Sequence, residues 1–205
     1  YDRSELVDAA LWTVAKVLLE GVALVVVILL VFLGDIRSSV IVVATLILTP
    51  LLTFFVMNQF GISANLMSLG GLAVAIGLMV DGSVVVVENA FGHLGRPNKY
   101  GKRKVHIILK AVVEVATPVV FGIGIIILVF LPLMTLKGME GKMFAPLAFT
   151  IAIALAISLL LSLTLTPVLS SYLLKGGAEH DTRLVGYLKK HYLRMLDWVL
   201  ANAKK

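Results

Sequence analysis

Five long apolar segments dominate this sequence of 205 residues. A helix needs about 20 mostly apolar residues to cross a bilayer. Prolines and glycines inside such helices are tolerated where neighbouring helices re-satisfy the backbone, so these segments are expected to pack together. We therefore predict an all-α membrane protein in which residues 1–174 form a five-helix bundle. The expected spans are residues 17–33, 40–57, 66–87, 112–134 and 144–174, the last interrupted by Pro167.

Composition supports a membrane protein and excludes several kinds of site. Hydrophobic residues make up 60% of the chain and charged residues 15%, whereas soluble domains have roughly 25% charged residues. Cysteine is absent, which excludes disulfides and thiolate metal sites. The net charge of +6 comes from basic residues between and after the apolar runs, as expected for loops that face anionic lipid. The bilayer is thus the expected partner, and nucleic acid is not.

The distribution of Lys and Arg predicts the orientation of the spans. One basic residue lies in GDIRSS, six lie in residues 92–110, and seven follow Leu174. The two remaining connections, NQFGISAN and KGMEGK, contain none and two. The positive-inside rule places the first three segments in the cytoplasm. The chain then enters its first span from outside, as expected of a piece of a longer protein.

Residues 182–203 have the pattern of an amphipathic helix. Apolar side chains fall on one helical face, and basic side chains lie elsewhere; the apolar set is Val185, Leu188, Tyr192, Met195 and Val199. We expect this helix to lie in the cytoplasmic interface, either as a simple anchor or as a coupling element or partner surface.

A carboxylate interrupts the third apolar segment, in AIGLMVDGSVVVVEN. Asp81 and Glu88 are seven residues apart, two helical turns, and so share a face. Gly70 and Gly77 lie on roughly the same stripe, which would let a neighbouring helix approach closely and bury Asp81. Ionisable residues inside membranes usually belong to ion pathways or proton relays, so we predict a proton-relay role for Asp81 and Glu88. A structural ion pair, or a carboxyl held protonated between helices, is the alternative.

Metal binding and enzyme chemistry receive less support. Met67 and Met79 lie twelve residues apart in the third span and are candidate thioether ligands for Cu(I) or Ag(I), although such methionines often only pack. The four histidines are expected in loops or the interfacial helix, without zinc-site spacing. A second membrane-embedded aspartate, a P-loop and a nucleophile elbow are all missing from the sequence. We predict neither an enzyme nor a resident cofactor.

Two long sequence blocks resemble one transporter family. SANLMSLGGLAVAIGLMVDGSVVVVENAFGHL and AVVEVATPVVFGIGIIILVFLPLMTLKGMEGKMFAPLAFT are similar to the membrane domain of the resistance-nodulation-division (RND) transporters, in particular the heavy-metal efflux branch. The resemblance implies a proton-driven antiporter of metal cations in the bacterial inner membrane. It also implies a homotrimer with twelve spanning helices per subunit, a periplasmic adaptor and an outer-membrane channel. This chain would supply helices two to six of the first half.

The resemblance assigns roles to particular residues. Asp81 matches the proton-relay aspartate of the family, and Glu88 with Asn89 matches the end of its VEN motif. The Co/Zn/Cd branch typically has another acidic residue six positions before the relay aspartate, where this chain has Ala75. Met67 and Met79 match a methionine relay of the Cu/Ag branch, whose further methionine in the fifth span is missing from FTIAIALAIS. The metal is therefore left open between divalent and monovalent ions.

Two other functions compete with metal export. The same helical unit resembles sterol-sensing and lipid- or drug-exporting relatives, although VDGSVVVVEN and GMEGKMFAPLAFT favour the metal branch. Alternatively, the chain is a structural fragment without transport activity. A periplasmic substrate site is expected to lie outside these residues, so the segment alone should not export metal.

Overall fold

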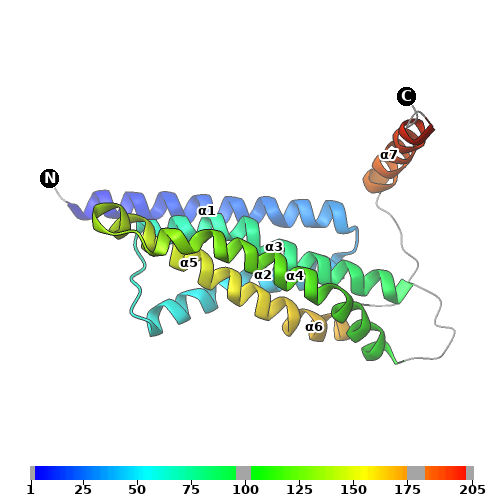
Figure 1. Cartoon of the computed structure of the whole chain (residues 1–205), viewed down its shortest axis with the longest axis horizontal. Helices are drawn as coiled ribbons and strands as arrows, with labels where there is room; N and C mark the ends of the chain where they lie inside the picture. The colour runs from blue at the N-terminus through cyan, green and yellow to red at the C-terminus, as the bar shows by residue number, and fades with distance from the viewer. Residues whose placement is uncertain (1–2, 96–102, 175–182, 202–205) are drawn as a thin grey trace.

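The computed structural model describes residues 3–95, 103–174 and 183–201, and every regular element in these ranges is an α-helix (Figure 1). The order along the chain is α1 (Arg3–Leu33), α2 (Ile36–Gln59), α3 (Leu66–Gly95), α4 (Lys104–Met134), α5 (Gly138–Leu163), α6 (Leu165–Leu173) and α7 (Arg183–Ala201). The predicted all-α membrane fold is confirmed.

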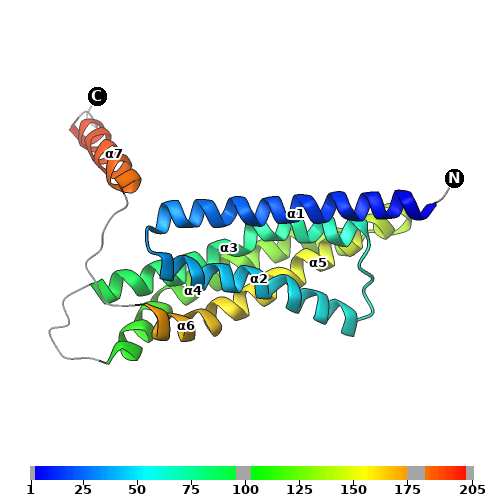
Figure 2. The same cartoon turned by 180° about the vertical axis from the view of Figure 1, so that it is seen from behind.

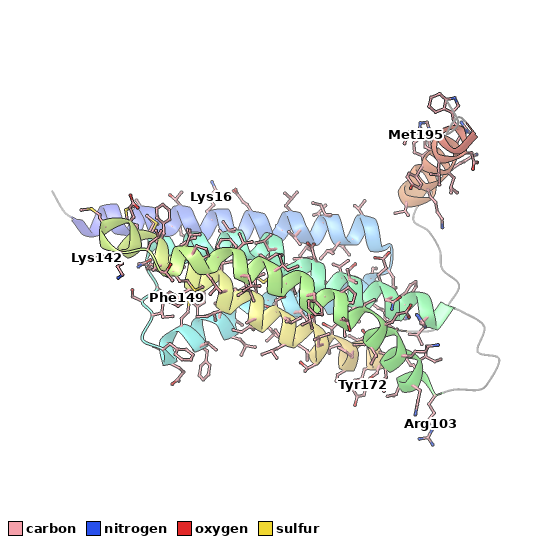
Figure 3. The ribbon with its side chains drawn as sticks, in the orientation of Figure 1. Lys16, Arg103, Lys142, Phe149, Tyr172 and Met195 are labelled. Atoms are coloured by element: carbon pink, nitrogen blue, oxygen red, sulfur yellow. The ribbon has the colours of Figure 1, made fainter. Side chains whose placement is uncertain are left out.

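Helices α1 to α5 run alternately in opposite directions along the bundle (Figure 1). Gly34 at φ 64° and the Asp35 N-cap, whose carboxylate accepts a hydrogen bond from the Ser38 amide at 3.1 Å, reverse the chain between α1 and α2. In the side-chain view, Lys142 lies near one end of the bundle, and Arg103 and Tyr172 lie at the other (Figure 3). The connections that are rich in Lys and Arg and those that are poor in them therefore lie at opposite ends of the bundle.

Among the described residues, four helical segments are long and apolar enough to cross a membrane: Ile36–Gln59, Leu66–Gly95, Lys104–Met134 and Gly138–Leu173. The expected first span lies in α1, whose apolar part, Leu19–Val31, is shorter than the other four. Both α3 and α4 continue beyond their expected apolar spans at the basic end. Helical hydrogen bonding does not require apolar side chains, so these helices extend past the hydrocarbon limits.

A break separates α5 from α6 near the expected proline. The helix ends at Leu163, Thr164 has φ −115° and ψ −66°, and α6 begins at Leu165. Pro167 has no N–H to donate to the carbonyl of Leu163, and its ring crowds that carbonyl. The fifth expected span is thus two helices. Pro50, Pro118 and Pro146 lie inside α2, α4 and α5 without ending them.

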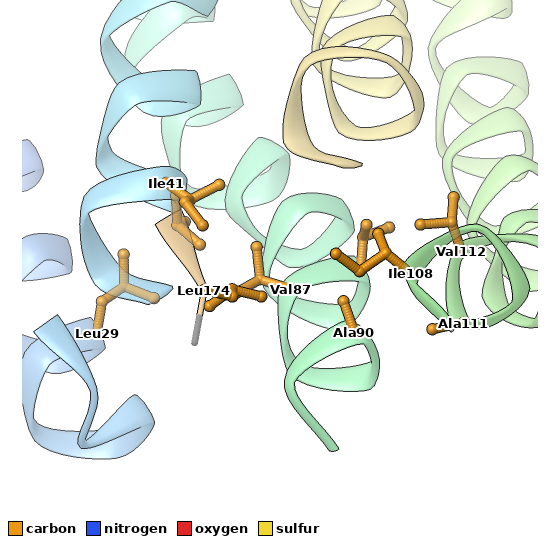
Figure 4. Packing of buried hydrophobic residues seen from close by; sticks show 10 residues of the cluster. Leu29, Ile41, Val87, Ala90, Ile108, Ala111, Val112 and Leu174 are labelled. Carbon is orange, nitrogen blue, oxygen red and sulfur yellow. The ribbon is translucent and has the colours of Figure 1, made fainter. Parts of the chain in front are cut away.

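Two apolar clusters hold the bundle together. One joins α1, α2, α3, α4 and the chain after α6; it contains Ile41, Val87, Ile108 and Leu174 (Figure 4). The second centres on Leu72, Met79, Ile151 and Leu155, all 2% exposed or less.

Helix α7 lies apart from the bundle and contacts only α1 among the described elements (Figure 2). The large side chains Tyr187, Tyr192, Met195 and Trp198 are exposed on it. An amphipathic helix beside the bundle matches the expected pattern, and its place in the interface stays a prediction.

Candidate functional site

Helix α3, which carries Asp81, is the central helix of the bundle. It contacts α1, α2, α4, α5 and α6. More than half of its most apolar window is buried, 56%, against 6% for α4. A side chain on α3 is thus placed where movement of any of five helices can affect it.

Asp81 lies on the one stripe of α3 that these neighbours leave uncovered. The exposed residues along α3 recur with helical spacing; they are Leu66, Val74, Gly77, Asp81, Val85 and Glu88. The prediction that Asp81 and Glu88 share a face is confirmed. The prediction that Asp81 is buried is wrong for the described part of the chain, because the five neighbours pack against the other sides of α3.

Neither carboxylate has a polar partner in the part of the chain that the structure describes. Within residues 3–95, 103–174 and 183–201, neither Asp81 nor Glu88 forms a hydrogen bond or an ion pair. The buried polar side chains of these ranges are all hydroxyls of serine or threonine. An ion pair between Asp81 and a residue of this part of the chain, the structural alternative, is therefore not formed.

Close helix packing occurs at other glycines than expected. A Cβ atom on Gly70 or Gly77 would meet nothing within 4 Å. On Gly71 it would lie 2.7 Å from the backbone oxygen of Leu147 in α5, and on Gly82 it would lie 3.2 Å from the Ile123 side chain of α4. The stripe with Gly70, Gly77 and Asp81 is open, and the adjacent glycines bring α3 against α5 and α4.

Polar side chains join α3 to α4 at the basic end. The Asn89 amide donates a hydrogen bond to the Ala111 carbonyl at 2.7 Å, and His93 Nε2 lies 2.9 Å from Glu114 Oε2. Neither contact was predicted from the sequence. The histidines were expected in loops or the interfacial helix, but His93 lies in α3 and His106 lies in α4. The signal in the sequence that could have predicted these contacts was the helical spacing of the polar residues that follow the apolar part of α3.

The candidate methionines lie in different surroundings. Met79 is buried in the second apolar cluster, and its backbone carbonyl accepts a hydrogen bond from Ser158 Oγ at 2.7 Å. Met67 is half-buried near the start of α3. Met57, a third methionine, was not among the sequence candidates; it is buried in α2, and its sulfur accepts a hydrogen bond from Thr150 Oγ1 at 3.7 Å. No group of three or more His, Asp or Glu that could hold a metal occurs in the described residues.

Comparisons with known proteins identify the family. The profile described as the AcrB/AcrD/AcrF family matches residues 1–205. The chain is 44% identical over 210 residues to the cobalt-zinc-cadmium resistance protein CzcA of Cupriavidus metallidurans, covering 98% of this chain and 20% of that protein. It is 41% identical to the nickel-cobalt-cadmium resistance protein NccA of Alcaligenes xylosoxydans xylosoxydans, covering 98% of this chain and 19% of NccA. It is 37% identical to the cation efflux system protein CusA of Escherichia coli strain K12, covering 97% and 20%.

A solved structure agrees with these relatives. The crystal structure of a heavy metal efflux pump superposes with a TM-score of 0.70 and 42% identity, covering 82% of this chain and 16% of the pump. The chain thus spans about a fifth of the length of its curated relatives. The resemblance to the heavy-metal efflux branch of the RND transporters, read from two sequence blocks, is confirmed, and the chain belongs to the AcrB/AcrD/AcrF family.

Proposed function

We propose that this chain is the proton-coupling part of a proton-driven exporter of heavy-metal cations, with Asp81 as the residue that binds and releases the proton. The observation that carries the proposal is the position of Asp81. It is an ionisable group in the apolar stretch of the central helix, on a stripe that this part of the chain leaves open. A carboxylate is energetically costly at such a position, and ionisable residues inside membranes are therefore usually functional or paired with another group of the protein.

The energetics fit such a role. A proton that moves inward across 100 mV releases about 2.3 kcal/mol. Protonation of Asp81 removes its charge from the stripe, which changes the preferred packing of whatever covers it. Because α3 contacts five helices, a shift of α3 is passed to the rest of the bundle.

We propose divalent ions as the substrates. Relatives at 41% and 44% identity are named for cobalt, zinc, cadmium and nickel. Met79 lies in an apolar cluster, where a thioether also serves as ordinary packing. The competing thioether site at Met67 and Met79 would instead favour Cu(I) or Ag(I). Sequence blocks shared with the metal branch argue against lipid or drug export and against an inactive fragment.

We further propose that the full-length protein is a homotrimer in the bacterial inner membrane that works with a periplasmic adaptor and an outer-membrane channel. Family membership supports these partners. Chemical cross-linking of the full-length protein in cells would detect trimers and the adaptor, and a protein that cross-links only as a monomer would contradict this arrangement.

The test of the relay is a resistance panel of Zn, Cd, Co, Ni, Cu and Ag in cells that express the full-length transporter. Asp81→Asn, which keeps the shape and removes the titratable group, should abolish resistance, and Asp81→Glu should restore part of it. Glu140→Gln, an exposed acid in the first turn of α5, is the matched control and should leave resistance intact. Normal resistance in Asp81→Asn at equal expression would refute the relay.

The same panel separates the metals. Met67→Leu and Met79→Leu should preserve resistance to divalent ions, because leucine fills a similar apolar volume. Selective loss of Cu and Ag resistance in either variant would instead establish a thioether role.

A further inference from the structure

Among the described residues, all but two of the buried polar side chains of the bundle have a hydrogen-bond partner. In the described residues they are twelve serine and threonine hydroxyls. Several of them donate to the backbone of their own helix; Thr49, for example, donates to the Thr45 carbonyl at 2.7 Å. Others cross to a neighbour, as Thr45 does to Ser83 of α3 at 3.1 Å and Ser158 does to the Met79 carbonyl. Membrane helices thereby satisfy hydroxyls in a medium that offers no other partner.

Thr166 and Ser170 of α6 are the exceptions. Both are 0% exposed, and neither hydroxyl oxygen has a hydrogen-bond partner among the described residues. They are four residues apart, so they lie on one face of α6 with Cβ atoms about 5–6 Å apart. A single water can hydrogen-bond to two hydroxyls at that spacing.

A third polar group lies at the break, three residues before Thr166. The carbonyl of Leu163 has lost its helical partner, because residue 167 is a proline. Nearby on α5, the Ser162 hydroxyl donates to the Leu159 carbonyl at 2.9 Å and lies opposite Gly82, where a Cβ would be 3.6 Å from it. The small side of α3 at Gly82 thus faces the polar end of α5.

We infer that the break between α5 and α6 contains an internal water site, formed by the hydroxyls of Thr166 and Ser170 and the carbonyl of Leu163. A buried water typically makes about three hydrogen bonds to otherwise unsatisfied groups, which is the number of groups present here. Water suits the site better than a metal ion, because the hydroxyls also need an acceptor and the described residues provide no buried carboxylate. The water replaces the hydrogen bond that Pro167 removes and joins the two helices across the break.

The test uses the full-length transporter in lipid nanodiscs, and its readouts do not depend on metal transport, so the inference stands apart from the proposed function. X-ray radiolysis in heavy-oxygen water converts bound water into hydroxyl radicals that label adjacent side chains. Leu169 on α6 should be labelled well above Leu155, a buried residue of α5. The double variant Thr166→Val/Ser170→Ala should reduce the labelling of Leu169 to the level of Leu155. Thr49→Val, which removes a buried hydroxyl that is already satisfied, should not change it.

Thermal unfolding gives an independent answer through its sign. With water bound, the double variant strands the water and should lower the melting temperature further than Thr49→Val does. If the site is dry, apolar replacements remove unsatisfied groups and should raise the melting temperature. A raised melting temperature, or labelling of Leu169 no greater than that of Leu155, would overturn the inference. A stabilisation by Na⁺ that the double variant abolishes would overturn it as well, since the occupant would then be a cation.

Discussion

The side-chain amide of Asn89 on α3 donates a hydrogen bond to the backbone carbonyl of Ala111 on α4, across 2.7 Å. It is made by a half-buried side chain to a backbone atom, whereas the nearby contact of His93 with Glu114 joins two side chains. It therefore fixes the register of α3 against α4 about two turns beyond Asp81.

Replacing Asn89 with alanine should destabilise the bundle by about 1 kcal/mol, because a hydrogen bond is lost and the cavity left is small. The free energy of unfolding, measured by titration with a denaturing detergent, gives the value. Asn58→Ala at the exposed end of α2 is the control and should change stability by less than about 0.5 kcal/mol. Equal effects of the two substitutions would mean that the contact with Ala111 contributes nothing.

Adjacent glycines on α3 should differ sharply when changed to alanine. A Cβ on Gly71 would lie 2.7 Å from the Leu147 oxygen, so the α5 backbone must move away. We expect Gly71→Ala to cost about 1–3 kcal/mol, the range for overpacking. Gly70→Ala meets nothing within 4 Å and should be neutral or slightly stabilising through helix propensity. The same denaturing titration compares the two, and a more destabilising Gly70→Ala would contradict the packing of α3 on α5.

The contact between His93 and Glu114 should contribute little. Their side chains are 11% and 58% exposed, so water screens the pair. A double-mutant cycle with His93→Ala and Glu114→Ala should give a coupling energy of roughly 0.2–1 kcal/mol, the range for exposed pairs. A coupling energy above that range would mean that the pair is less accessible to water in the membrane than its exposed fractions in this chain indicate.

Asp81→Asn should separate stability from transport. Because Asp81 has no polar partner in the described residues, the free energy of unfolding of this chain should change by less than about 0.5 kcal/mol. Loss of resistance in the full-length transporter, with unchanged folding of the chain, would assign the carboxylate to coupling. A large destabilisation of the chain would reveal a structural role.

The length of the apolar segments was sufficient to predict the spanning helices, and the seven-residue spacing predicted the face shared by Asp81 and Glu88, because both follow from local chain geometry. Pro167 likewise predicted the interruption after α5, since the missing N–H is a property of the residue itself. The extensions of α3 and α4 were not expected. Hydropathy identifies the residues that lie in the hydrocarbon layer, whereas a helix can continue beyond that layer into polar surroundings.

The side of α3 that is covered could not be read from the sequence. Gly70 and Gly71 are neighbours with the same side chain, and only the position of Leu147 decides which of them meets α5. Burial of Asp81 was inferred from small residues on its stripe, yet small residues permit contact without requiring it. Asn89 was noted for its motif, but its bond to Ala111 depends on where α4 lies.

Helix α3 is much longer than the hydrocarbon layer is thick. Its 30 residues extend about 45 Å at 1.5 Å per residue, against a layer of roughly 30 Å. If Leu66 marks the outer boundary, the layer ends about 20 residues later, near Val86. The bonds of Asn89 and His93 to α4 then lie at the water line, where they can exchange with solvent. Asp81 remains inside the hydrocarbon depth, about one and a half turns from that boundary, so the distance a proton must cover to reach aqueous solution on that side is short.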